Sequence, residues 1–282
     1  MKFNLWSQYG ALNSAPVFTA FERGATALGY ETEHNSTDGD VDVIWSVLWK
    51  GRMAPNKKIF EKAKAEGRKV IVLEVGAIKR NYSWKMGIGG VNARAIFGDV
   101  LNNRGRADFL QLKADKWRKN EEGHILIASQ HNESGQWEYK EQQREWVADV
   151  CKTIRLHTDR PIVIRQHPRC ADRYDNLTPN TIIQHPKKIA GTYDDYDLDL
   201  SKAYAVVSYS SNTGIHAALR GVPVFCSHTS LAWSVGNLDI NNINKPLMPA
   251  RRQWMNDLAY TEWTTDELLS GKPLLRLTPF LE

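Results

Sequence analysis

Four consecutive polar residues in the second half of the chain have side chains suited to anion binding. They separate the apolar run 205–207 and Ser208-Tyr209 from a helical pattern that ends at Leu219, and they are Ser210, Ser211, Asn212 and Thr213. The first turn of a helix has backbone N–H groups without intrahelical partners, and its dipole favours negative charge. Ser, Asn and Thr are also good N-caps. The stretch therefore predicts either an anion site or a plain capped helix.

A second polar cluster, Arg165, His167 and Arg169, follows the apolar run Pro161–Ile164. Pro168 restricts the residue before it, so His167 is held in an extended turn. Arg and His side chains can neutralise a pyrophosphate. A histidine in this setting can also be a hydrogen-bonded core residue, and both interpretations stay open.

A carboxylate, Glu74, stands at the end of a strand expected over Val70–Val75. A carboxylate at a strand end can act as a general base. It can also be a structural group that pairs with Lys79 or Arg80. The sequence leaves both roles open.

The residues after Glu74, from 76 to 92, are rich in glycine, basic and aromatic side chains, and we expect them to form a ligand-binding loop. Basic groups can hold phosphates, and aromatic rings can stack on a base or a sugar. The candidate acceptor-binding residues of this loop and its continuation are Lys79, Arg80, Tyr82, Trp84, Lys85 and Arg94. The glycines at 87, 89 and 90 do not form the dinucleotide fingerprint, because their spacing is wrong and no strand directly precedes them.

The elements that must position these residues follow an α/β order. Strand and helix patterns alternate in the first half, which is typical of a doubly wound parallel sheet. The second half repeats the pattern, with strands expected at His124–Ala128, Pro161–Ile164, Thr181–Gln184, Val206–Val207 and Val222–Cys226, and helices at Trp137–His157 and Thr213–Leu219. We expect two Rossmann-like domains, residues 1–119 and 120–250, followed by C-terminal helices over 251–282 that pack across both.

Composition narrows the class of protein. The chain has 282 residues, and its three cysteines have no metal-ligand spacing, so we expect no metal site and a reducing, cytoplasmic location. We see no signal peptide and no apolar run long enough to span a membrane. Residues 1–119 hold 20 Lys and Arg against 12 Asp and Glu, whereas the remainder holds 17 against 20. The first half is therefore suited to a polyanion, or it carries a solvated basic face.

The two polar clusters resemble a known family. Arg-Gln-His-Pro, followed by Ser-Ser-Asn-Thr-Gly-Ile-His-Ala-Ala-Leu-Arg-Gly-Val-Pro-Val, is similar to the "HP" and "SS" motifs of the capsule-polysaccharide and polysialyltransferase-like glycosyltransferases. Those enzymes have the GT-B fold, with two Rossmann-like domains that face a cleft. The resemblance covers about residues 123 to 227. The family often has a paired-acidic-Gly motif for its general base, and this chain has only Glu74-Val75-Gly76 there.

The resemblance implies a nucleotide-sugar donor, expected to be a UDP-sugar, and no metal cofactor. It places the donor phosphates on His167 and on Ser210 and Ser211, with Gln130 at the lip of the site. With the residues beside them, the predicted donor site comprises Gln130, Arg165, His167, Ser210, Ser211, Asn212 and Thr213. The oligomeric state is not predicted.

The acceptor belongs to the basic first half. Its composition and the Trp-rich tail are similar to phage-encoded glycosyltransferase-like proteins, which favours the 5-hydroxymethyl group of a modified pyrimidine in double-stranded DNA as acceptor, in a host cytoplasm. The base would be flipped out or reached through the major groove. Two alternatives stay open: a glycosyltransferase of bacterial capsule or surface polysaccharide, and a non-catalytic protein that binds nucleotide sugars or nucleic acid.

Overall fold

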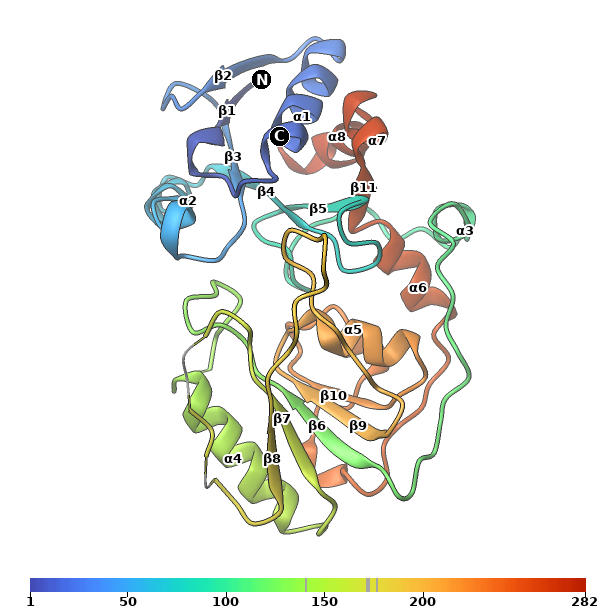
Figure 1. Cartoon of the computed structure of the whole chain (residues 1–282). Helices are drawn as coiled ribbons and strands as arrows, with labels where there is room; N and C mark the ends of the chain where they lie inside the picture. The colour runs from blue at the N-terminus through green and yellow to red at the C-terminus, as the bar shows by residue number, and fades with distance from the viewer. Residues whose placement is uncertain (140, 171–172, 176) are drawn as a thin grey trace. The chain divides into compact units, whose positions relative to one another are not determined.

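The computed structural model describes residues 1–139, 141–170, 173–175 and 177–282. It divides into two compact units (Figure 1). Unit 1 comprises Met1–Leu112 and Met255–Glu282, and unit 2 comprises Lys113–Trp254. The final segment thus returns to the unit that holds the N-terminus, and the division at residue 112 lies close to the boundary expected at 119.

Unit 1 is built on a six-stranded mixed sheet with the order β11-β5-β4-β3-β1-β2. The strands are β1 (Lys2–Leu5), β2 (Glu31–His34), β3 (Val41–Trp45), β4 (Lys69–Val75), β5 (Ser83–Ile88) and β11 (Glu262–Thr264). The first four run parallel to one another, while β5 is antiparallel to both β4 and β11. The parallel part has the flavodoxin-like order of a doubly wound sheet.

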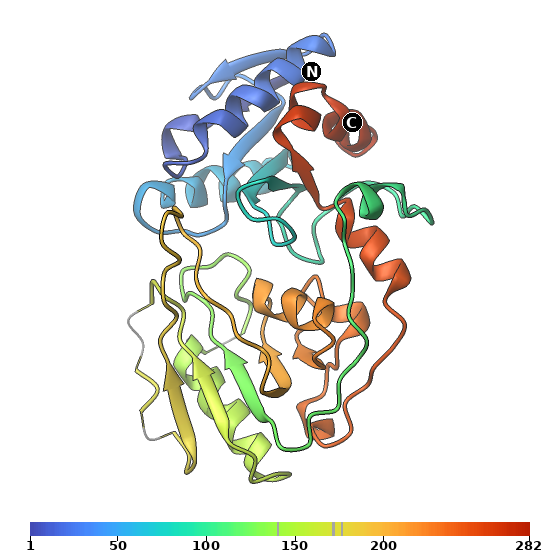
Figure 2. The ribbon, with the colours of Figure 1, turned by 45° about the vertical axis from the view of Figure 1, so that its right-hand side comes forward.

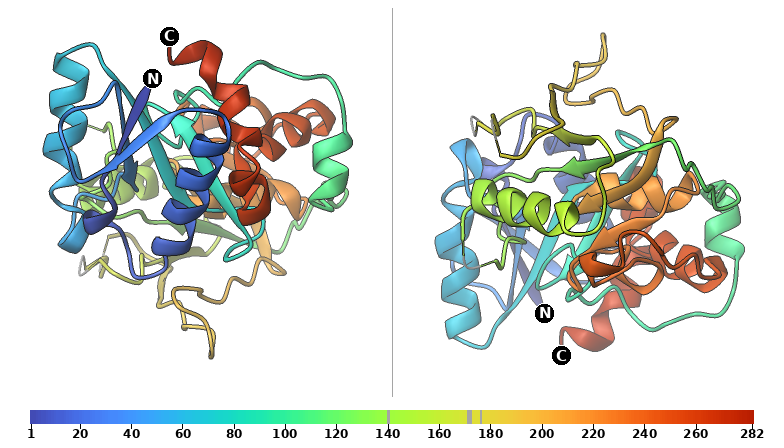
Figure 3. Two further views of the ribbon diagram at one scale, coloured as in Figure 1. Left: turned by 90° about the horizontal axis from the view of Figure 1, so that it is seen from above. Right: turned by 90° about the horizontal axis from the view of Figure 1, so that it is seen from below.

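Helices cover both faces of this sheet. They are α1 (Ala15–Ala27), α2 (Asn56–Ala65), α7 (Thr265–Leu269) and α8 (Lys272–Leu277). Two further helices are α3 (Gly105–Phe109), which lies in unit 1, and α6 (Arg252–Ala259), which contains the division between the units. Ile71 and Leu73 of β4 face the core formed with α1, α7 and α8. The alternate residues Val70 and Val72 face α2. Figure 3 shows α1 and α7 side by side on one face.

Three strands of unit 1, β2, β5 and β11, lie where the sequence predicted none. Residues 83–88 of the expected loop form β5, in which Trp84, Met86 and Ile88 alternate toward the main core. The third strand of this region, β11, lies between α6 and α7, where only helices were expected. The loop prediction was therefore wrong for 83–88, because pairing with β4 and β11 buries this segment despite its content of Gly and Lys.

Unit 2 has a fully parallel five-stranded sheet with the order β10-β9-β6-β7-β8. Its strands are β6 (His124–Ala128), β7 (Ile162–Arg165), β8 (Thr181–Gln184), β9 (Ala203–Ser208) and β10 (Val224–Cys226). Helix α4 (Gln143–Arg155) packs on one face, and α5 (Asn212–Leu219) packs against β9 and β10 on the other (Figure 2). This is the strand order of a Rossmann sheet.

The predicted fold class is confirmed, since both units are Rossmann-like and both sheets are parallel or mostly so. Some boundaries differ. Helix α4 begins at Gln143 and not at Trp137, and Lys140 in that expected helix lies outside the described residues.

Within the described part of the chain, no helix has the length and apolar character needed to cross a membrane.

Candidate functional site

The carboxyl ends of three strands of unit 2 meet in one polar cluster. Ser129 and Gln130 follow β6, His167 follows β7, and Ser210 follows β9. Strands β6 and β9 are neighbours, and the strand order reverses between them. This is the topological switch point of the sheet, the place where open α/β sheets bind ligands. The structure therefore brings the two sequence motifs together at the expected edge.

Gln130 connects the first and last of these strand ends. Its Oε1 accepts hydrogen bonds from Ser210 N at 3.2 Å and from Ser210 Oγ at 3.0 Å. Its backbone N–H donates to the buried side chain of Gln143 at the start of α4. Gln130 and Ser210 are both largely buried, so these bonds fix the floor of the cluster.

His167 is held from two sides. Its backbone N–H donates to Ser129 Oγ at 2.7 Å, and its ring lies edge-on to the ring of His131, with the centroids 5.4 Å apart. His131 directly follows Gln130, and it is buried. His131 was missed by the sequence interpretation, although its place after a strand end was the available signal.

Both rings have the same orientation relative to the backbone. Nδ1 of His167 accepts from Arg169 N at 3.2 Å, and Nδ1 of His131 accepts from Glu133 N at 3.1 Å. A neutral imidazole with an accepting Nδ1 carries its proton on Nε2, where it is a hydrogen-bond donor. Each histidine can therefore offer a donor to an anion in its neutral form, and a charged donor when protonated.

The N-terminus of α5 completes the cluster. Ser211 is the N-cap, and its Oγ accepts from Thr213 N at 3.3 Å. Asn212 and Thr213 form the first turn. Gly214 is required behind them, because a Cβ there would lie 2.7 Å from Ser208 Oγ, which is closer than packed atoms approach. Because Gly214 has no side chain, α5 can lie directly against β9.

Arg165 lies differently from the prediction. Only 9% of the residue is exposed, and its guanidinium donates to the backbone carbonyl of Asp197. Burial lowers the pKa of Arg165, opposed by the nearby Asp197 carboxylate. Arg165 thus holds the segment around Asp197 to the end of β7. Among the cluster's basic residues, Arg169 is exposed and pairs with Asp194 at 3.1 Å.

In unit 1, Glu74 lies at the end of β4 and is half-buried. Its Oε2 accepts a hydrogen bond from Ser46 Oγ, and its Oε1 accepts from Val75 N at 2.8 Å. Both oxygens are thereby oriented. A carboxylate with fixed oxygens at a strand end has the geometry expected of a general base.

Glu74 belongs to a row of charged residues across three strands. The sheet register places Glu74 opposite Lys85, and Lys85 opposite Glu262. Burial lowers the pKa of Lys85, while Glu262 and Glu74 raise it. Glu262 is buried and accepts hydrogen bonds from Ala77 N, Ile78 N and Ser83 Oγ. Glu262 therefore fixes the 76–82 loop through hydrogen bonds at both of its ends.

The predicted acceptor residues divide into two groups. Trp84 is 7% exposed and packs on Trp45, and Lys85 is 3% exposed, so the expectation that these two lie in an exposed loop is wrong. Tyr82 is exposed, with Lys79 Nζ 5.2 Å from its ring centroid. Arg94 is exposed and Arg80 is half-buried. The acceptor role of these four residues stays a prediction.

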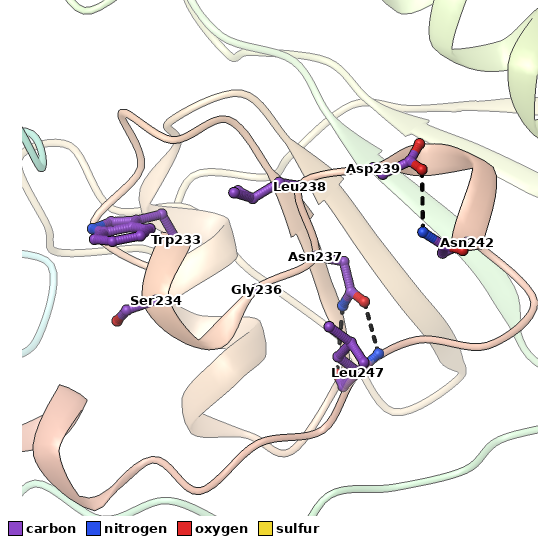
Figure 4. A pocket seen from close by; sticks show the side chains of 8 residues that line it. All are labelled: Trp233, Ser234, Gly236, Asn237, Leu238, Asp239, Asn242 and Leu247. Atoms are coloured by element: carbon purple, nitrogen blue, oxygen red, sulfur yellow. Dashed lines mark hydrogen bonds between the residues drawn. The ribbon is translucent and has the colours of Figure 1, made fainter.

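A pocket of about 350 Å³ lies elsewhere in unit 2 (Figure 4). It is lined by Trp233, Ser234, Gly236, Asn237, Leu238, Asp239, Asn242 and Leu247. Its polar side chains are engaged locally: Asn237 Nδ2 donates to Val224 O, and Asn242 Nδ2 donates to Asp239 Oδ2. None of the predicted donor-site residues lines it. The switch-point cluster, and not this pocket, has the chemistry for phosphate.

No group of three or more His, Cys, Asp or Glu residues in the described ranges is arranged to hold a metal ion. The buried thiols are unreactive in character: burial raises the pKa of Cys151 to about 11 and that of Cys226 to about 12.

Comparisons with known proteins give structural neighbours only. No protein-family model matches the sequence, and no curated protein matches it. A solved structure of Thermosulfurimonas dismutans KpsC, a β-Kdo 2,7-transferase, is similar with a TM-score of 0.49 and 14% identity, covering 98% of this chain and 99% of that chain. The β-Kdo 2,4-transferase of the same KpsC is similar with a TM-score of 0.45 and 10% identity, covering 95% and 98%. Similarity at this level does not assign an activity.

Proposed function

We propose that this protein is a glycosyltransferase that binds the phosphate of a nucleotide-sugar donor at the switch point of unit 2. The observation that carries the proposal is that three strand ends meet beside the N-terminus of α5: Ser210 donates to Gln130, and the backbone N–H of His167 donates to Ser129, which precedes Gln130. Helix N-terminal N–H groups and imidazole donors stabilise phosphate, both when the donor binds and when the nucleotide leaves with its negative charge.

In the proposed reaction, an acceptor hydroxyl attacks the anomeric carbon of the sugar. The bond from that carbon to the phosphate oxygen breaks, and the electron pair leaves with the nucleotide. A carboxylate takes the hydroxyl proton, and Glu74 is the proposed base because both its oxygens are held in place at a strand end. His131 and His167 oppose the charge that develops on the leaving phosphate.

For the acceptor we propose a saccharide, as in the synthesis of a bacterial surface polysaccharide, and not DNA. Duplex DNA binding depends on exposed cations that replace counterions. Three basic residues of the first half are engaged: Lys85 is buried, Arg104 pairs with Asp108 at 2.9 Å, and Arg106 forms a buried ion pair with Glu267. The exposed ring of Tyr82 suits contact with a sugar face.

The donor site is tested by isothermal titration with a panel of nucleoside mono- and diphosphates. His167→Ala should weaken binding of the preferred nucleotide about tenfold or more, as loss of a charge-assisted hydrogen bond requires. The chain contains a matched control, because the tripeptide Gln-His-Pro recurs after β8, where His185 is exposed. His185→Ala should leave the affinity unchanged.

Two results would contradict the donor site. One is that no nucleotide of the panel binds, and the other is that His185→Ala weakens binding as much as His167→Ala. Binding without turnover of any nucleotide sugar would instead favour the non-catalytic alternative.

A further inference from the structure

Ser46 has an unusual backbone conformation for a buried residue. It directly follows β3, its φ is +64°, and only 2% of it is exposed. An L residue with a Cβ is disfavoured in this left-handed region, and Gly adopts it without strain. Strained residues of this kind persist where the surrounding structure fixes them, and they cluster at functional sites.

The bonds of Ser46 explain what the conformation achieves. Its backbone N–H donates to Leu73 O at 2.7 Å, which fixes it to the strand that carries Glu74. Its Oγ accepts from Leu48 N at 3.0 Å and donates to Glu74 Oε2. Oγ thus accepts the Leu48 N–H through a lone pair, and its own O–H proton is directed at the carboxylate.

We propose that Ser46 is a positioning residue for Glu74, an inference that rests on the proposed role of Glu74 as base. The hydroxyl and Val75 N each hold one carboxylate oxygen, so the carboxylate is fixed in orientation. The left-handed backbone is the means by which a hydroxyl at the end of β3 reaches the end of β4.

Other charged groups act on the same carboxylate. Lys85 of β5 lies opposite Glu74 in the register, Glu262 of β11 lies beyond it, and Arg80 of the following loop interacts with Lys85. Since these groups are unchanged in a Ser46 variant, the hydroxyl contribution can be measured separately.

Ser46→Gly tests the proposal, because it removes the hydroxyl and suits the left-handed backbone. We expect little change in thermal stability, because relief of the left-handed strain offsets the loss of the two Oγ hydrogen bonds, together with a kcat reduced about tenfold to a hundredfold and an unchanged KM for the donor.

Ser83→Ala is the matched control. Ser83 is also buried, and its Oγ donates to a carboxylate, Glu262 Oε2, at 2.7 Å. Losing this bond should lower stability, while kcat per folded molecule and the KM for the donor stay as in the wild type. The contrast separates positioning of the base from general support of the sheet.

An activity-independent measurement completes the test. The side-chain carboxyl of Glu74, labelled with carbon-13 and assigned with Glu74→Gln, is observed by NMR at one fixed pH in the wild type and in Ser46→Gly. A displaced or broadened carboxyl resonance in Ser46→Gly supports the proposal, and an unchanged resonance overturns it even if no acceptor is known. Full kcat in Ser46→Gly also overturns it. Full activity in Glu74→Gln would overturn the assignment of the base, and with it this inference.

Discussion

The carboxyl edges of the two sheets carry opposite kinds of side chain. In unit 2 the strand ends present imidazoles, hydroxyls and an amide around a helix N-terminus, a setting that favours an anion. In unit 1 the corresponding end of β4 presents a carboxylate, in a row with a buried lysine and a second carboxylate. In the proposed reaction, the edge in unit 2 holds the leaving phosphate and Glu74 in unit 1 accepts the proton.

The largest expected effect is a loss of kcat that distinguishes the proposed base from the proposed donor site. Glu74→Gln should reduce kcat about 10²- to 10⁴-fold, the usual contribution of a general base, with unchanged nucleotide affinity. Steady-state kinetics and titration calorimetry measure the two quantities. Glu61→Gln, in the exposed face of α2, is the control and should change neither. Loss of nucleotide affinity in Glu74→Gln would remove the distinction between the two edges.

The second effect concerns the structural carboxylate of the row. Glu262→Gln should destabilise the protein by about 3 kcal/mol, because it leaves the buried Lys85 with one counter-charge fewer and weakens the bonds to Ala77 N and Ile78 N. Chemical denaturation measures the change. Stability within about 0.5 kcal/mol of the wild type would show that Glu262 is not the anchor of the 76–82 loop.

A smaller effect tests the packing behind the donor site. Gly214→Ala places a Cβ against Ser208 Oγ and Val224, so we expect a loss of about 1–3 kcal/mol and a weaker nucleotide affinity as α5 moves away from β9. Ala217→Gly, in the same helix, is a control that lowers helix stability without adding a contact. An unchanged affinity in Gly214→Ala would show that nucleotide binding does not depend on how closely α5 packs against β9.

The smallest effect compares one helix cap in each unit. Ser211→Ala and Thr264→Ala each remove an N-cap and should each cost about 1 kcal/mol. Only Ser211→Ala should also weaken nucleotide binding, because Thr264 caps α7 in unit 1. Equal effects of both variants on nucleotide affinity would contradict the placement of the donor on α5.

Much of unit 2 could be predicted from sequence, because its elements are local and regular. Strands β6 and β8 have the bounds that their apolar runs indicate, and the switch-point residues follow from parallel strand ends. The buried position of Arg165 and its hydrogen bond could not be predicted, since its partner Asp197 lies 32 residues away in a loop. His131 could have been predicted from its position just after β6, but the site was sought at the His-Pro and Ser-Ser motifs.

Unit 1 was less predictable because its site depends on contacts distant in sequence. Strand β11 has three residues and pairs with β5 from nearly the other end of the chain, so no local pattern marks it. That pairing buries Lys85 within the sheet, whereas the sequence predicted it in a basic loop. The left-handed conformation of Ser46 likewise has no local cause, because it results from bonds to Leu73 and Glu74.

The most direct measurement is mass spectrometry of acceptors incubated with the protein and a panel of nucleotide sugars. The acceptors are surface-polysaccharide oligosaccharides and DNA that contains 5-hydroxymethylpyrimidines, with Glu74→Gln in parallel. We predict that an oligosaccharide gains the mass of one sugar and that Glu74→Gln abolishes most of this gain. A gain on DNA alone would contradict the saccharide acceptor, and no gain on either acceptor with any donor would contradict the glycosyltransferase proposal.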